Sequence, residues 1–468
     1  MRKESLCKIR MKRVLLYTIL GAFALFAHAL NNPDNSCRRI EITKDQSLAS
    51  QMRFSTSYYV IRDVFDLEGG IITIPQGCIL RFDGGQFKNG TVIGNKSYIE
   101  AAPYPIFSGS LTIKGSFDAA DAFPEWFEND DDAIKIRKSL SFFDRVKLTA
   151  KHYILKSVDE NGYGIVVPAG CILEGNRRAN NTSGNDQIIE MKKGINYTAV
   201  VALSTNSILT NLTIYGPNLK NSSCVATVEG FQSRINIERV GVSGSYYGFN
   251  LQVYLSNLSQ CVANYNEVGF YIHGSYTGNT IKVEGTSVNL STCFAVDSKK
   301  TGYEIAGITY STMNNCAADG CGAPASGNLK KDTEIGYAYS FTQSKNLTVN
   351  SCGAEYCLAA VKTLACKNII FNAPSYLINK RKDVRVANSY EMSPIFNIRY
   401  SSYIEFNYMF LNAEGMSKYY NDKTVLMKLY GSANPAPSVI IKRGYEGIKE
   451  CNIGTEGFLV KSKNLVYE

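Results

Sequence analysis

Histidine is scarce in this chain, with three residues among 468. Only His152 and His273 lie beyond the first 29 positions, and the sequence offers no Ser-His-Asp arrangement for either of them. There is also no Walker loop, and no Gly-x-Gly-x-x-Gly motif occurs in a strand–helix setting. These absences exclude the hydrolase, nucleotide-hydrolysing and dinucleotide-binding classes that depend on such motifs.

Long apolar runs are confined to the N-terminus. Six Lys or Arg residues precede the apolar run 14–26, and Ala27-His28-Ala29 has the form of a signal-peptidase cleavage site. We therefore expect residues 1–29 to be a signal peptide. The mature protein would start near Leu30 and be periplasmic, cell-surface or secreted, without a stable membrane span. An uncleaved anchor is the alternative, although the run is short for a bilayer.

Net charge argues against a nucleic-acid partner. The whole chain carries +9, and residues 1–29 hold six basic residues and one Glu, a net of +5, which leaves 9 − 5 = +4. A nucleic-acid-binding protein needs a concentrated basic face. Export would permit disulfides among the remaining cysteines, but a chain of this length builds a core that does not require them. The oligomeric state stays open.

A short motif recurs between residues 257 and 357. The segment 257–263 (NLSQCVA) returns as 289–295 (NLSTCFA), with looser copies at 314–318 and 346–354. Gly-aromatic pairs accompany the motif, at Gly248-Phe249, Gly269-Phe270, Gly302-Tyr303 and Gly336-Tyr337. Short β-branched runs separate these marks. Such repetition predicts a solenoid in which each small coil buries apolar side chains against its neighbours.

The pattern divides the chain into four parts. After the signal peptide we expect an N-terminal β-rich region with opening coils at 30–120, a solenoid body at 121–375, and C-terminal coils or a cap at 376–468. Asp130-Asp131-Asp132 predicts one helix N-terminus at the start of the body, covering an end of the coil stack. Residues 281–283 are expected to be a coil strand, and 321–334 a loop that leaves one coil.

The start of the body resembles a known family. Four features, in this order, resemble the start of pectate-lyase-superfamily proteins. They are Trp126-Phe127, the acidic cluster with Ala133-Ile134, and the strand segments 146–155 and 164–175, the second of which carries Pro168-Ala-Gly170. That superfamily includes polygalacturonases and the glycan-degrading tailspikes of phages. The resemblance spans about 120–375, and it implies an all-β, right-handed parallel β-helix. The family's Gly-Ala-x-Gly-Asp-Gly loop is missing here.

The resemblance implies a glycan partner but leaves the reaction open. Two of the four polygalacturonase motifs, Asn-Thr-Asp and Gly-His-Gly, are missing beyond residue 29. Arg-x-Lys occurs only as Arg145-Val146-Lys147, at the start of the first strand segment, and the only Asp-Asp pairs lie in the helix lead. Two functions therefore remain. One is a glycoside hydrolase or polysaccharide lyase acting on a complex glycan, and the other is a non-catalytic β-helix that binds glycan or forms a surface structure.

The motif alignment nominates a first set of acidic residues. If Cys and Ala of each repeat point inward, Asp319 and Glu355 point outward one coil apart. Two carboxylates about 5 Å apart suit a retaining glycosidase. They would also suit Ca²⁺, which a lyase would use to stabilise a substrate carboxylate. Asp297 is a weaker catalytic candidate, and solvated surface acids are the alternative. No cofactor is assigned otherwise, and metal ligands are unknown.

The Gly-aromatic pairs nominate a second set. The outward positions that follow them are Asn250, Tyr271, Glu304 and Ala338. Tyr271 could stack on a sugar ring while Glu304 and the nearby Lys299 bind the sugar's polar groups; a mixed surface ladder without function is the alternative. His273 is interpreted as a turn histidine.

The cysteines of the repeat are expected to form a buried column of thiols, at 261, 293, 316 and 352. Cys321 and Cys357 follow two of them five residues later. Residues five apart in one strand face opposite ways, so a four-thiolate zinc site is disfavoured.

Overall fold

The computed structural model describes residues 37–176, 187–278, 280–322, 336–378, 395–412, 427–430, 439–442 and 465–467. The chain forms two compact units, Met1–Ala119 and Ala120–Glu468. The expected signal peptide lies outside the described residues. Within the ranges given above, no helix is both long and apolar enough to cross a membrane.

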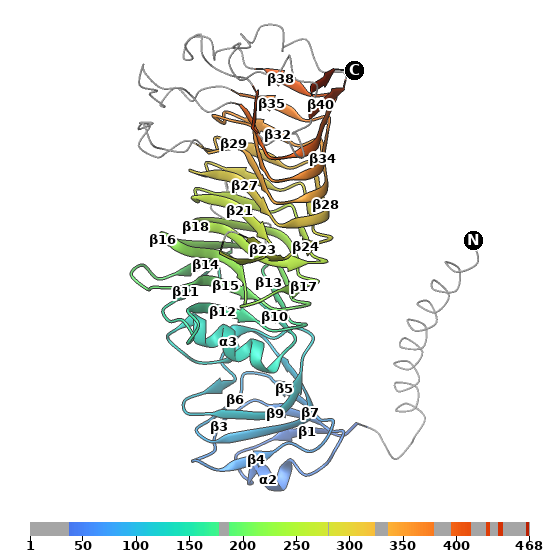
Figure 1. Ribbon diagram of the computed structural model, residues 1–468. Helices are drawn as coiled ribbons and strands as arrows, with labels where there is room; N and C mark the ends of the chain where they lie inside the picture. Colours follow the sequence, from blue (N-terminus) through green and yellow to red (C-terminus); the bar gives the residue numbers. More distant parts are fainter. Residues whose placement is uncertain are drawn as a thin grey trace, which may run out of the picture. The chain divides into compact units, whose positions relative to one another are not determined.

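The first unit consists of parallel strands in two sheets (Figure 1). Its core is aromatic, since the ring centroid of Phe82 lies 5.4 Å from Phe87 and 5.8 Å from Phe107. The strands are β1 (Arg39–Ile42), β2 (Tyr58–Ile61), β4 (Ile71–Thr73), β5 (Ile79–Phe82), β7 (Thr91–Ala101) and β9 (Thr112–Asp118) in one sheet, and β3 (Val64–Asp66), β6 (Gln86–Lys88) and β8 (Phe107–Ser108) in the other, with the short helix α2 (Leu48–Gln51).

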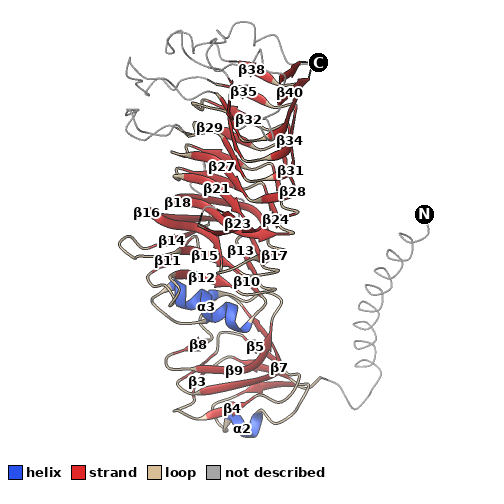
Figure 2. Cartoon of the chain, in the orientation of Figure 1, coloured by secondary structure: helices blue, strands red, loops and turns tan. Residues whose placement is uncertain are grey.

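The predicted helix opens the second unit. After the turn η1 (Pro124–Trp126), α3 (Asp132–Phe142) begins where the Asp131 carboxylate accepts a hydrogen bond from the Ala133 N–H at 2.9 Å. Arg137 of α3 donates to the carbonyls of Gly164 and Ser157 at 2.8 and 2.9 Å. The helix therefore lies against the first coil of this unit (Figure 2).

The second unit is a solenoid of three-sided coils in which each strand pairs in parallel with its equivalent in the next coil. The first face contains β10 (Arg145–Lys147), β13 (Ile172–Glu174), β19 (Asn257–Ser259), β25 (Asn289–Ser291), β28 (Ile308–Asn314), β31 (Lys345–Asn350), β34 (Lys367–Asn372), β37 (Ser402–Asn407), β40 (Val439–Lys442) and β41 (Leu465–Tyr467). The second face contains β11 (His152–Leu155), β14 (Ile188–Met191), β20 (Val262–Asn264), β26 (Phe294–Val296), β29 (Ala317–Asp319), β32 (Gly353–Glu355), β35 (Ser375–Leu377) and β38 (Phe410–Asn412).

The third face contains β12 (Tyr163–Val167), β15 (Ala199–Leu203), β21 (Val268–His273), β27 (Thr301–Ala306), β30 (Tyr339–Thr342), β33 (Val361–Leu364), β36 (Phe396–Arg399) and β39 (Met427–Tyr430). The long strands β16 (Ile208–Thr227) and β18 (Asn236–Tyr254) bend through all three faces, and β17 (Gln232–Ser233) and β24 (Gly285–Thr286) are short links.

Left-handed residues turn the chain from the first face to the second. Gln260, Thr292, Asn315 and Ser351 have φ of 53, 53, 51 and 48°. Each precedes an inward cysteine of the predicted thiol column, and these cysteines (261, 293, 316 and 352) are 0–1% exposed. The expectation for Cys321 and Cys357 was wrong, because both are also buried. A second corner, at Gly320 and Tyr356, interrupts the alternation of the strand.

Aromatic rings stack along the interior of the third face. Phe249, Phe270, Tyr303 and Tyr339 follow one another with centroid distances of 4.9, 4.8 and 5.1 Å, and neighbouring planes are within 9° of parallel. The separation matches the spacing of about 4.8 Å between paired strands. The last member corrects the sequence alignment, since Tyr303 pairs with Tyr339 rather than with Tyr337.

One segment departs from the coil pattern. Residues 281–283, expected to be a coil strand, belong to β23 (Thr280–Val283), which pairs antiparallel with β22 (Ser275–Thr277). The resulting hairpin leaves the solenoid between β21 and β24. An alternating sequence identifies a strand but not the direction of its partner, which is why the sequence did not reveal the hairpin.

Candidate functional site

Two outward columns run along the third face, and residues from both line an open cleft of about 790 Å³. In the first column, Asn250, Tyr271, Glu304, Ser340 and Lys362 are register partners in successive coils. The second column lies two residues further along each strand and contains Gln252, His273, Ala306, Thr342 and Leu364. The predicted neighbours Tyr271 and Glu304 are thus side by side, and the next outward residue is Ser340, not Ala338 as expected.

Glu304 is the carboxyl group of this cleft. Burial raises its pKa, and the positive charges of Lys362 and Lys300 only partly oppose that shift. A carboxyl in such an environment holds its proton to higher pH than an exposed one does. Glu304 can therefore donate a proton or a hydrogen bond where a surface glutamate would be ionised.

A row of aromatic rings extends from Glu304 along the face. Tyr271 stacks on Tyr247 at 5.2 Å between centroids, and Tyr246 meets Tyr247 edge-on at 4.6 Å. Lys300 lies 4.6 Å above the Tyr246 ring and donates to its hydroxyl at 2.7 Å. Burial raises the pKa of Tyr247 to about 12. The Tyr247 phenol therefore keeps its proton at physiological pH, and the row offers ring faces and hydroxyl groups to a ligand.

His273 orients this row and has little freedom of its own. Its Nδ1 donates to the Gly274 carbonyl at 2.7 Å, its Nε2 lies 3.1 Å from the Asn250 Oδ1, and its ring stacks on Tyr271 at 4.3 Å. Burial lowers the pKa of His273. Both ring nitrogens face oxygen atoms of neighbouring residues and the ring is stacked, so the imidazole is held in place, which fits a residue that positions Tyr271.

The other predicted residues lie on the second face or at its corner. Asp319 and Glu355 are direct register partners, as the alignment predicted; Asp319 is half-buried and Glu355 is exposed. Asp297 occupies the corner between the second and third faces with φ of 51°. Lys299 forms an ion pair with Glu267 at 3.1 Å. The structure therefore separates the two sets of candidates, with Asp319 and Glu355 on one face and Tyr271 and Glu304 on the next.

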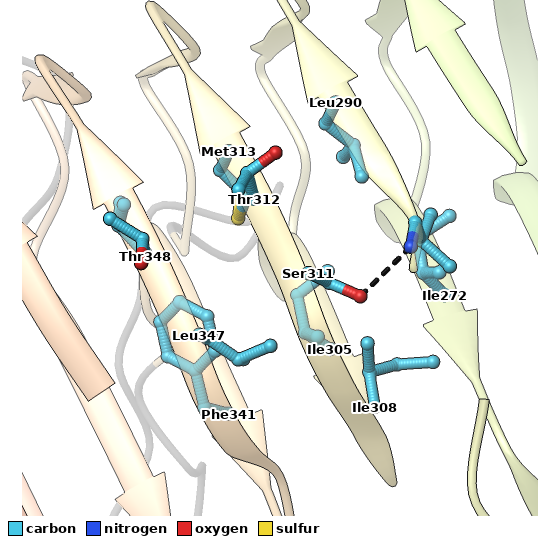
Figure 3. Close-up of a pocket in the computed structure, with 12 residues that line it drawn as sticks. Ile272, Leu290, Ile305, Ile308, Ser311, Thr312, Met313, Phe341, Leu347 and Thr348 are labelled. Carbon is cyan, nitrogen blue, oxygen red and sulfur yellow. Dashed lines mark hydrogen bonds between the residues drawn. The ribbon is translucent and has the colours of Figure 1, made fainter. Parts of the chain in front are cut away.

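The interior of the coils is filled by side chains. The gap between the first and third faces has a volume of about 10 Å³, and apolar groups such as Leu290, Ile305 and Phe341 surround it (Figure 3). Ser311 is satisfied there, because its hydroxyl accepts from the Val288 N–H at 2.9 Å. A space that admits at most one water cannot bind a substrate. Among the described residues, no group of three His, Cys, Asp or Glu side chains is arranged to hold a metal ion.

No family model and no curated protein matches this chain by sequence. Solved structures do match. The gp42 tailspike of Acinetobacter phage vb_AbaP_AS12 has a TM-score of 0.50 at 13% identity, covering 69% of this chain and 56% of the tailspike. Tailspike protein 2 of the Escherichia coli O157:H7 bacteriophage CAB120 also has a TM-score of 0.50, at 12% identity, covering 74% and 46%. The fold is a right-handed parallel β-helix.

This result confirms the fold that the sequence resemblance implied. The β-helix spans about half the length of the two tailspikes that it matches. At this level of identity the likeness concerns the fold alone, and function depends on the geometry of the cleft.

Proposed function

We propose that this β-helix is a carbohydrate-active protein that binds a glycan chain along the third face and cleaves it, with Glu304 as the proton donor. The observation that carries the proposal is the half-buried carboxyl of Glu304, with its raised pKa, beside Tyr271 in an open cleft. General acids that act near neutral pH commonly have such a pKa.

The row of tyrosines supports a sugar as the ligand. Sugars present apolar C–H faces that stack on aromatic rings, and hydroxyls that pair with polar side chains. Tyr247 and Tyr271 supply the rings, and Gln252 lies at the cleft wall. The resemblance to a superfamily of polygalacturonases and glycan-degrading tailspikes favours the same class of substrate.

Binding without cleavage is the second candidate, and one observation favours it. The charged groups that act on Glu304 within the described residues are the lysines Lys300 and Lys362, not a carboxylate. A retaining glycosidase needs a second carboxylate about 5 Å away. Asp319 and Glu355 remain a predicted pair of that kind on the second face, where Ca²⁺ binding also stays a prediction.

Assays on chemically distinct polysaccharides test the proposal. Polygalacturonate, alginate, dextran and xylan would be incubated with the protein, with new reducing ends and the ultraviolet absorbance of unsaturated ends as readouts. We expect Glu304→Gln to lose about 10²- to 10⁴-fold in turnover, the usual contribution of a general acid. The exposed pair Glu284–Lys345 supplies the control Glu284→Gln, which should keep full activity.

Two further variants locate the site. If Asp319→Asn and Glu355→Gln abolish turnover and Glu304→Gln does not, the active site lies on the second face and the proposal is wrong. Retention of a glycan by the wild-type protein, without new chain ends, would establish the binding function instead. We also propose that the protein is exported, which N-terminal sequencing of native material would test.

A further inference from the structure

The antiparallel hairpin of β22 and β23 carries Tyr276 into the cleft. Tyr276 pairs with Ile281 across the hairpin and lines the same cleft as Glu304 and Tyr271. All other strand pairings between described residues are parallel. The hairpin is thus an insertion in the coil pattern, placed at the end of the strand that bears Tyr271.

The base of the hairpin is tightly fixed. The Gly274 N–H donates to the Ala306 carbonyl at 2.8 Å, and the Gly285 N–H donates to the Gly307 carbonyl at 2.9 Å. A Cβ on Gly274 would lie 2.5 Å from the Val283 oxygen, and a Cβ on Gly285 would lie 2.5 Å from the Val253 oxygen. Both ends of the insertion are therefore held close against neighbouring backbone, and Tyr276 has a defined position.

The hydroxyl of Tyr276 is enclosed and has no hydrogen-bond partner among the described residues. Buried tyrosine hydroxyls ordinarily find one. Tyr303 illustrates this, since its hydroxyl donates to the Cys293 carbonyl at 2.6 Å. Leaving a donor unpaired costs stability, and such a group at a cleft calls for an explanation.

Glu304 is a candidate acceptor for the unpaired Tyr276 hydroxyl. Burial and then the charge of Glu304 raise the pKa of Tyr276 to about 12, so the phenol keeps its proton when the carboxyl loses its own. The other charged groups around Glu304 are Lys300 and Lys362. The charge of Glu304 also contributes to raising the pKa values of the Tyr247 and Tyr271 phenols. His273, whose pKa is lowered by burial, lines the same cleft.

We propose that Tyr276 is a positioning residue for Glu304: its free hydroxyl donates a hydrogen bond to the Glu304 carboxylate once Glu304 has given up its proton. This inference rests on the proposed role of Glu304 and gives that role a partner. In the structure no hydrogen bond joins the two groups, and in this proposal ionisation of Glu304 brings its carboxylate to the Tyr276 hydroxyl. The bond would lower the energy of the ionised acid and favour proton transfer out of a poorly hydrated site.

The test is a comparison of Glu304 titrations in the free protein. Nuclear magnetic resonance of side-chain-labelled glutamate would follow the wild type, Tyr276→Phe and Tyr303→Phe. A hydrogen bond to a charged group corresponds to about 1 to 2 pH units. We therefore expect Tyr276→Phe to raise the titration midpoint of Glu304 by that amount, and Tyr303→Phe to leave it unchanged.

Stability supplies a second readout. Below the titration of Glu304, Tyr276→Phe should match or exceed the wild-type melting temperature, because it removes an unpaired hydroxyl. Above that titration it should melt at a lower temperature than the wild type, and this pH-dependent difference should vanish in the Glu304→Gln background. Tyr303→Phe should melt at a lower temperature at every pH.

An unchanged Glu304 titration in Tyr276→Phe would overturn the inference, and so would a pH-dependent loss that persists in the Glu304→Gln background. Should Tyr276→Phe fail to fold, Glu304→Gln tests the contact from the other side. The phenol of Tyr276 must then ionise at lower pH than in the wild type, and an unchanged phenol would refute the pairing. None of these measurements uses a glycan, so failure here is distinct from failure of the proposed function.

Discussion

Removing one ring from the interior stack should weaken the solenoid by a predictable amount. Phe270 is fully buried and stacks on Phe249 at 4.9 Å and on Tyr303 at 4.8 Å. A Phe→Ala change in a core costs about 3–5 kcal/mol through lost burial and the cavity left behind. Two lost ring contacts add about 1–3 kcal/mol together. We therefore expect Phe270→Ala to reduce the free energy of unfolding by about 4 kcal/mol or more.

Urea denaturation followed by far-ultraviolet circular dichroism would measure this loss. Phe294→Ala is the control, because Phe294 is 43% exposed on the second face and should cost about 1 kcal/mol or less. If Phe270→Ala costs less than about 2 kcal/mol, or no more than the control, the stacked rings do not carry the stability that their burial implies.

Three further predictions concern single side chains. Glu304 has a raised pKa when folded, so the folded state keeps a proton that the unfolded state has lost. The free energy of unfolding should therefore fall as pH rises from the ordinary pKa of glutamate through the raised one. Thermal melts across pH should show that Glu304→Gln flattens this slope. Asn350 donates to Asn314 at 2.8 Å and accepts from Asn372 at 2.9 Å, so Asn350→Ala should cost about 1–3 kcal/mol in urea, and a loss near zero would show that this ladder of amides is dispensable. Cys293→Asp should cost several kcal/mol because it buries an unpaired charge, whereas the exposed Cys37→Ser should melt like the wild type; equal melting of both would place Cys293 at the surface.

The fold was predictable from the sequence because the residues that define each coil lie close together in the chain. Each corner needs a left-handed residue followed by a small buried one, and each strand alternates, so the repeat around Cys261 and Cys293 reports the coil directly. The register of Asp319 with Glu355, and of Tyr271 with Glu304, followed from the same repeat. Past Cys321 the repeat is interrupted, and there the alignment slipped by two residues, to Tyr337 instead of Tyr339.

The sequence could not show which face of the solenoid carries the candidate site. Alternation shows that Asp319 and Glu304 both point outward, but it does not show which outward column borders a cleft. That depends on the hairpin, whose partner direction the sequence does not state, and on burial by neighbouring coils. The raised pKa of Glu304 comes from this burial. Sequence reasoning therefore ranked Glu304 below Asp319 and Glu355 as a catalytic group, and it missed Tyr276.

The central claim is that glycan binds on the third face. Hydroxyl-radical footprinting of tyrosines tests this claim most directly. The protein would be footprinted with and without the polysaccharide, among the four assayed, that it retains. Tyr271 and Tyr276 line the cleft, and Tyr247 stacks on Tyr271 beside it. Tyr356 and Tyr310, which are 50% and 68% exposed, report on other surfaces. The account predicts that glycan protects the cleft tyrosines and leaves Tyr310 and Tyr356 unchanged. Protection of Tyr356, beside Glu355, without protection of Tyr271 would contradict it.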